Sequence, residues 1–200
     1  MSSDNHSEQP PRRGRGRPRR EGADAQILDE TFALLREKGY TDLTVDEVAE
    51  RTKVAKTTIY RRWPSKGALV AAAVATRTPA FEPPDTGSLE GDLMVVVNRA
   101  FLILTGELSG VLAGLVGESQ LDAELREIVL SATRQRRQIY EAVVRRAVDR
   151  GELGEDVDVE LLVDVLVGAL WNRLLITRAE LRESLPREIV QMVMNGVSPR

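Results

Sequence analysis

Apolar residues recur at helical spacing in the first part of the chain. Leu28, Phe32 and Leu35 stand at i, i+4 and i+7, and their segment ends at Lys38 and Gly39, a cation followed by a typical C-cap glycine. Runs in which apolar and polar residues alternate, as they do in half-buried strands, are few. The pattern therefore predicts an all-α protein whose first helix begins near residue 23.

Two short helices are predicted next, with a tight turn between them. Thr44 and Glu47 form a capping box that opens the first of them, which must end near residues 52–53. The second is expected at residues 55–62, with Val54, Ile59 and Trp63 as core contacts. Two short helices joined in this way form a helix-turn-helix.

The residues after this motif predict a fourth helix. Pro64 ends the third helix, Ser65 can cap the fourth, and Lys66 lies in its first turn. A lysine at this position works against the helix dipole, so its ammonium is expected to have another partner. Phosphate is the expected one, because the helix N-terminus would bind the same anion.

The second part of the chain is also predicted to be helical. Prolines and glycine at residues 79–91 mark a connection between domains, and helices follow at about residues 88–106, 108–117, 121–150, 158–181 and 184–196. The segment 161–176 is apolar almost all round. It is expected to form an interface between two copies of the chain together with apolar residues of the last helix, namely Ile189, Val190, Val193, Met194 and Val197. The alternative is the central core helix of a monomer.

Charge is divided unevenly along the chain. The formal net charge is −3, but residues 1–78 carry 15 Lys and Arg against 11 Asp and Glu, and residues 79–200 carry 13 against 20. A basic first part can approach phosphate and an acidic second part is repelled by it. Contact with nucleic acid is therefore expected in the first part.

Residues 1–22 are predicted to be a disordered basic arm, because they are rich in Ser, Pro, Gly and Arg and lack apolar periodicity. Within them, the sequence Arg-Gly-Arg-Pro at 15–18 resembles the core of an AT-hook, in which Arg15 and Arg17 would lie in a narrow A·T-rich minor groove. The alternative is a basic tail that attracts phosphate without regard to sequence.

Composition argues against several classes of site. The chain has no Cys, and its single His, His6, lies in the polar N-terminal arm. A thiolate metal site, a cysteine nucleophile and a His-based triad are therefore not expected. A glycine-rich phosphate loop is also absent, so we expect no enzyme, no catalytic residue, no cofactor and no metal. No secretory signal or membrane-spanning segment is visible, and a cytoplasmic protein without a membrane partner is expected.

Three segments follow one another in order and without gaps: LTVDEVA at 43–49, VAKTTIYRRW at 54–63 and SKGAL at 65–69. With them, residues 24–75 resemble the N-terminal domain of the TetR family of bacterial helix-turn-helix regulators. The resemblance implies an N-terminal three-helix helix-turn-helix DNA-binding domain at 23–78 and a C-terminal helical ligand-binding (effector) and dimerisation domain at 79–200. Lys53 departs from the family, which usually has glycine in the turn. If Lys53 is left-handed, it costs about 1 kcal/mol relative to glycine.

The predicted motif assigns roles to individual residues. In a helix-turn-helix the second helix enters the major groove, and the expected base contacts are Lys56, Thr57, Tyr60 and Arg61. The resemblance implies phosphate contacts, which fix register without reading sequence, from Thr44, Thr58, Arg62 and Lys66. Ordinary solvated side chains are the alternative for the cations, and packing is the alternative for Tyr60.

An effector pocket is expected between the middle helices. Its predicted lining, in which each residue is otherwise plain core, is Phe101, Leu104, Leu115, Tyr140, Trp171 and Leu174. The arginines at 134, 136 and 137 are expected to form a solvated face. An aromatic content of 4% and the lack of interior His or Cys favour a small apolar organic effector over a metal.

The predicted function is a homodimeric repressor of a palindromic double-stranded DNA operator. Effector binding would favour a dimer whose recognition helices no longer match the half-site separation of ~34 Å. The alternative is an architectural or constitutive DNA-binding protein without an effector. A fully packed second domain would favour that alternative, and a cavity of several hundred cubic ångströms would argue against it.

Overall fold

The computed structural model describes residues 18–78 and 80–197, with side chains for residues 22–78 and 80–196. Arg15 and Arg17, the predicted minor-groove contacts, lie outside the described residues. Within the described ranges the chain is all-α and has no strand. In chain order the elements are α1 (Pro18–Asp42), α2 (Val45–Thr52), α3 (Lys56–Arg62), α4 (Lys66–Ala75), α5 (Leu89–Thr105), α6 (Ser109–Glu118), α7 (Ala123–Asp149), α8 (Val159–Asn172), the π-helical turn η1 (Arg173–Thr177) and α9 (Leu185–Val197).

Side-chain caps fix the starts of five of these helices. Each cap accepts a hydrogen bond from the backbone N–H three residues later, which satisfies a donor that the helix leaves free. The caps of α2, α4, α5, α7 and α8 are Thr44, Ser65, Ser88, Asp122 and Asp158. The capping roles predicted for Thr44 and Ser65 are confirmed.

Helix α1 begins five residues before its predicted start. Pro18 suits the first helical position, because the N–H that it lacks would have no helical partner there. Residues 18–22 have no apolar periodicity by which this start could be predicted. At the other end Gly39, with a φ of 79°, interrupts the helix where the C-cap glycine was predicted.

Helix α8 ends earlier than predicted. The α-helical part stops at Asn172, the π-helical turn follows, and Arg178 adopts a left-handed conformation with a φ of 53°. A non-glycine residue in this conformation is uncommon and leaves no clear signature in the sequence. The predicted continuation to residue 181 is therefore wrong.

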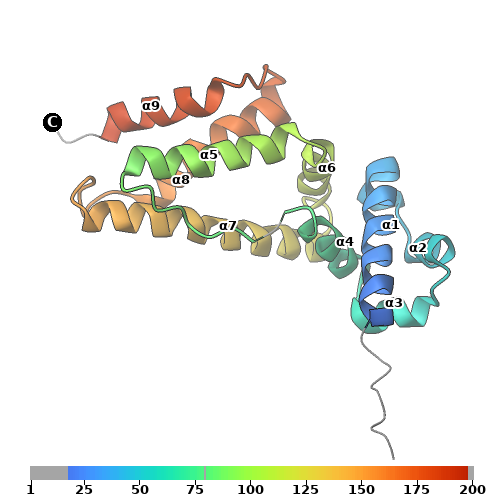
Figure 1. The fold of residues 1–200 in the computed structure, drawn as a ribbon. Helices are drawn as coiled ribbons and strands as arrows, with labels where there is room; N and C mark the ends of the chain where they lie inside the picture. Colours follow the sequence, from blue (N-terminus) through green and yellow to red (C-terminus); the bar gives the residue numbers. More distant parts are fainter. Residues whose placement is uncertain (1–17, 79, 198–200) are drawn as a thin grey trace, which may run out of the picture.

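The helices form two groups that share one apolar core (Figure 1). In the first group α1 packs on α2 and α4, and α2 packs on α3. In the second group α5 and α8 lie between α9 on one side and α7 on the other. Contacts of α4 with α7 and of α1 with α6 join the two groups.

No single helix in the described part of the chain is both long and apolar enough to cross a membrane. Only α5 and α6 taken together meet those two criteria, and they are bent by 86° relative to each other.

Candidate nucleic-acid interface and internal cavity

The turn between α2 and α3 is set by backbone geometry at Lys53. This residue has a φ of 56° and a ψ of 29°, which is the left-handed conformation, and its N–H donates to the carbonyl of Ala49. The N–H of Val54 donates to the same carbonyl at 3.2 Å. The predicted core contacts are confirmed, because Ile59 is fully buried and Val54 and Trp63 pack against the core. The chain thus forms a helix-turn-helix.

Helix α3 presents one polar face to solvent. Its only buried residue is Ile59, and the four predicted base contacts, Lys56, Thr57, Tyr60 and Arg61, are all exposed. Their spacing of one and four residues puts them on one side of the helix. In Figure 1, α3 lies at the end of the molecule away from α5, α8 and α9. The structure therefore brings these four residues together on an accessible surface.

Lys56 already has a partner within the motif. Its Nζ lies 2.8 Å from a carboxylate oxygen of Asp46 on α2 and 5.9 Å from the centre of the Tyr60 ring. The hydrogen bond to Asp46 raises the pKa of the Lys56 ammonium above its usual value. Lys56 thus links the two helices of the motif in the free protein.

The four predicted phosphate contacts lie in different environments. Thr44 is exposed at the start of α2, and Thr58 is half-buried on α3. Arg62 forms an ion pair with Asp24 of α1. The Nζ of Lys66 donates to the carbonyl of Tyr40 at 2.9 Å and lies 4.2 Å from the centre of the Tyr40 ring. The partner of Lys66 in this structure is therefore the C-terminal end of α1, where the sequence suggested a phosphate.

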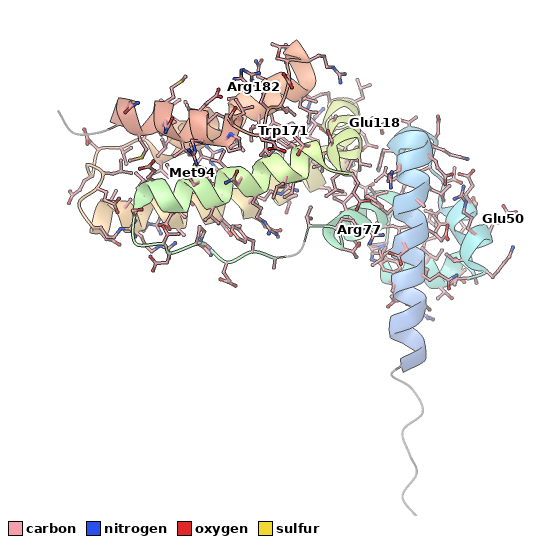
Figure 2. All side chains as sticks on the ribbon, turned by 45° about the horizontal axis from the view of Figure 1, so that its top comes forward. Glu50, Arg77, Met94, Glu118, Trp171 and Arg182 are labelled. Atoms are coloured by element: carbon pink, nitrogen blue, oxygen red, sulfur yellow. The ribbon has the colours of Figure 1, made fainter. Side chains whose placement is uncertain are left out.

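A cavity of about 530 Å³ lies between α4 and the helices of the second group. Its walls come from α4, from the segment after it, from α5, α6 and α7, and from Trp171 of α8. Figure 2 shows Trp171 among the long helices of the second group, toward the end at which α6 lies. The lining is mostly apolar and is partly open to solvent. A volume of this size is typical of small-molecule sites.

The structure puts two of the six predicted lining residues at this cavity, Leu115 and Trp171. Of the other four, Phe101, Leu104 and Tyr140 are buried in the core, and Leu174 is half-buried against it. Their chain neighbours Ile103 and Ile139 line the cavity instead. Adjacent helical residues point about 100° apart, so an error of one position turns a side chain from the cavity to the core.

Helix α4 contributes lining that was not predicted. Val70, Val74 and Ala75 of this helix face the cavity, although α4 follows directly on the helix-turn-helix. The signal was present in the sequence, because all nine residues of α4 after Lys66 are Ala, Val, Leu or Gly, so the helix has no polar stripe. A helix that is apolar almost all round needs partners on two sides.

Arg136 of α7 is a lining residue that the sequence reading assigned to a solvated face, together with Arg134 and Arg137. Only Arg134 fits that assignment, with a side chain that is 63% exposed. Arg137 is half-buried and pairs with Asp164 at 3.1 Å. Arg136 is half-buried at the cavity, and burial lowers the pKa of its guanidinium. Its position four residues after Ala132 and four before Tyr140, on the apolar stripe of α7, was the signal that could have identified it.

The outer face of α8 carries exposed apolar side chains. Leu161 is 58% exposed, Val165 is 51% exposed, and Ile176 in the following turn is 74% exposed.

On α9, however, three of the residues predicted for an interface, Ile189, Val190 and Val193, are buried within the chain's own core, and Met194 is half-buried. The apolar stripe of α9 is used for packing on α5 and α8, and Met192 is its exposed apolar residue. The side chain of Val197 lies outside the described residues.

Comparison with known proteins covers most of the chain. Residues 27–73 match the bacterial regulatory proteins of the tetR family, and residues 83–193 match the tetracyclin repressor-like C-terminal domain. The uncharacterized HTH-type transcriptional regulator YdeS of Bacillus subtilis is 37% identical over 185 residues, which are 92% of this chain and 93% of that protein. The DNA-binding transcriptional repressor TetR of Mycobacteroides abscessus is 32% identical over 78% of this chain and 84% of its own.

A solved structure agrees with these matches. The crystal structure of the TetR family transcription regulator SCO0332 is similar to this chain with a TM-score of 0.70 and 34% identity, over 88% of this chain and 99% of that one. The two matched regions are separated by residues 74–82, which include the end of α4 and part of the connection to α5. Each matched region therefore corresponds to one of the two groups of helices.

Proposed function

Because the chain belongs to the TetR family of bacterial regulators and is a DNA-binding transcriptional regulator rather than an enzyme, we propose that it is a homodimeric repressor, released from its operator by a small organic effector. The observation that carries the proposal is the cavity of about 530 Å³ walled in part by α4, the helix that directly follows the recognition helix.

On the DNA side, the exposed face of α3 reads bases. The side chains expected to enter a major groove are Lys56, Thr57, Tyr60 and Arg61, all of them exposed, and Thr44 and Thr58 contact phosphate. When Lys56 and Arg62 bind DNA, groups of the DNA replace their carboxylate partners or share the two cations with them. Lys66 holds the start of α4 on α1. Arg15 and Arg17 add a minor-groove contact in this scheme.

The coupling between effector and operator runs through α4 and α7. At Gly67 in the first turn of α4 an added Cβ would lie 2.6 Å from Cδ1 of Ile128 on α7, so the two helices approach closely. A molecule between Val74 of α4 and Ala132 of α7 would separate them. Since α3 and α4 are joined by only three residues, a shift of α4 moves the recognition helix. A repressor whose two recognition helices change their separation loses its match to the half-sites.

The domain assignment follows from the same argument. We assign residues 23–78 to DNA binding and residues 79–200 to effector binding and dimerisation, with α4 serving both parts. An architectural or constitutive DNA-binding protein, the alternative, has no use for such a cavity.

The test fills the cavity without needing the effector. Operator fragments are first selected from the source genome with the purified protein, and binding is then measured by fluorescence anisotropy. Ala132→Trp, which projects into the cavity, is expected to lower operator affinity about tenfold or more, because occupancy then favours the released state.

Ser131→Trp is the matched control, since Ser131 is the exposed neighbour on the same helix. It should leave operator affinity unchanged. If a folded Ala132→Trp protein bound the operator as tightly as the wild type, occupancy of the cavity would not control DNA binding. Transcription in vitro from a promoter that contains the selected operator distinguishes repression from activation.

A further inference from the structure

We propose that the effector is an organic acid, with a carboxylate that pairs with Arg136 and an apolar body that fills the rest of the cavity. The inference rests on the proposed function, because it names the chemical class of that effector.

Arg136 stands out among the arginines of α7. Of the three that are half-buried, Arg137 pairs with Asp164, and Arg146 pairs with Asp85 and donates to the carbonyl of Pro84. Among the residues that the structure describes, no hydrogen-bond or ion-pair partner is found for Arg136. Within the described part of the chain, two of these guanidinium groups are therefore paired, and Arg136 at the cavity has neither a hydrogen bond nor an ion pair.

The charged residues of the cavity wall also favour an anionic ligand. The lining contains two arginines, Arg99 and Arg136, and no Asp or Glu from the described residues. The guanidinium of Arg99 lies over the Phe81 ring at 4.3 Å, so it is held at the wall. The hydroxyl group of Thr78 donates to the carbonyl of Val74, and that of Thr133 donates to the carbonyl of Val129. Two positive charges on a mostly apolar wall without a described carboxylate attract an anion and repel a cation.

A carboxylate suits Arg136 better than a neutral polar group does. The guanidinium fork donates two parallel hydrogen bonds to a carboxylate, and these bonds are stronger than those between neutral groups. Burial lowers the pKa of Arg136, because the charged guanidinium loses hydration there. A neutral ligand would not compensate for that loss. A carboxylate offsets that loss. The surrounding side chains, among them Ile103, Leu115 and Ile139, suit an apolar body.

The experiment compares two fluorescent probes with the same aromatic body. Anilinonaphthalene sulfonate carries an acid group, and N-phenylnaphthylamine lacks it. The full-length protein is expected to bind the sulfonate at least about tenfold more tightly. Decanoate should displace the bound sulfonate at lower concentration than decanol does.

Arg136→Gln should weaken binding of the sulfonate by about tenfold to a hundredfold and leave the neutral probe unaffected. Arg134→Gln, the exposed arginine two residues earlier, is the control and should change neither. Arg136→Lys keeps the charge and should retain part of the preference. The melting temperature of Arg136→Gln should not fall, because a desolvated charge is removed.

The outcomes separate the two proposals. If the wild type binds both probes equally, or if Arg136→Gln leaves sulfonate binding unchanged, the organic-acid inference is overturned and the effector site stands. If Ala132→Trp, which fills the cavity, leaves binding of both probes unchanged, or if neither probe binds the wild type, the proposed effector site fails and the inference fails with it.

Discussion

Lys53 shows how a single residue can hold a motif in shape at a cost. Its backbone is left-handed, with a φ of 56°, and its N–H and that of Val54 both donate to the carbonyl of Ala49. These bonds end α2 and turn the chain toward α3. For a residue with a Cβ this conformation is less favourable than for glycine.

Lys53→Gly is therefore expected to stabilise the protein by about 1 kcal/mol, measured as a shift of the urea unfolding midpoint at constant m-value. Lys53→Ala removes the same side chain and keeps the Cβ, so it should stay close to the wild type. Equal stabilisation by both variants would assign the effect to the lysine side chain and contradict the backbone explanation.

Cations expected to face DNA have partners of their own in the free protein. Lys56 is bonded to Asp46, Arg62 to Asp24, and Lys66 to the end of α1. Sequence reasoning identified these positions as cations of a helix-turn-helix, but it could not identify their partners. Asp24 and Tyr40 come from α1, 38 and 26 residues away along the chain, and only the packing of α1 brings them close.

Helix α2 is the element whose start is most fully determined by its side chains. The hydroxyl of Thr44 accepts from the N–H of Glu47 at 3.3 Å, and the Glu47 carboxylate accepts from the N–H of Thr44 at 3.4 Å. An ion pair with Lys38 lowers the pKa of Glu47 and keeps its carboxylate ionised. This reciprocal cap fixes α2, against which α3 is set.

Thr44→Ala removes the cap acceptor and is expected to destabilise the protein by about 1 kcal/mol, seen as a lower melting temperature. Thr44→Ser keeps the hydroxyl group and should lie close to the wild type. Should the alanine variant melt with the wild type, the cap contributes nothing measurable and α2 is held by its packing alone.

Elements were predicted well where caps and periodicity mark them. Thr44 and Ser65 lie at helix boundaries in the structure as the sequence pattern predicts, and Gly39 lies at the break within α1. The start of α1 at Pro18 was not predicted, because residues 18–22 have no apolar periodicity. The end of α8 at Asn172 was not predicted either, because the apolar run continues through Leu174, Leu175 and Ile176 of the π-helical turn and does not mark where the α-helix stops.

The candidate cavity was harder to predict than the helices around it. Which side of α5 or α7 faces a cavity depends on how the helices are rotated against each other, and periodicity does not give that rotation. Leu115 and Trp171 lie at the cavity, whereas Phe101 and Tyr140 face the core. For the same reason the sequence pattern predicts a solvated side chain at Arg136, which the structure puts at the cavity.

At the scale of the whole molecule, the two groups of helices are joined by one continuous core. Ile27 and Leu34 of α1 belong to the same buried cluster as Val143 of α7 and Val190 of α9. Because α4 lines the cavity and also packs on α1, a change at the cavity reaches the helix-turn-helix through packed side chains. In the single chain, the outer face of α8 remains exposed to solvent.

That face is where we expect the second copy of the chain. Val165 is 51% exposed, and an added Cβ at Gly168 on the same helix would meet nothing within 4 Å. Val165→Glu is expected to weaken self-association by at least about a hundredfold, because two facing copies would bury two unpaired carboxylates at a two-fold interface. Sedimentation at micromolar concentration would then show a monomer where the wild type is a dimer, and affinity for a palindromic operator would fall with it.

Leu121→Glu, at a residue that is 93% exposed between α6 and α7, is the control and should remain dimeric. Gly168→Arg adds bulk at an open position and should dissociate the dimer without unfolding the chain. A wild type that sediments as a monomer, or a Val165→Glu protein that stays a dimer, would exclude the outer face of α8 as the interface.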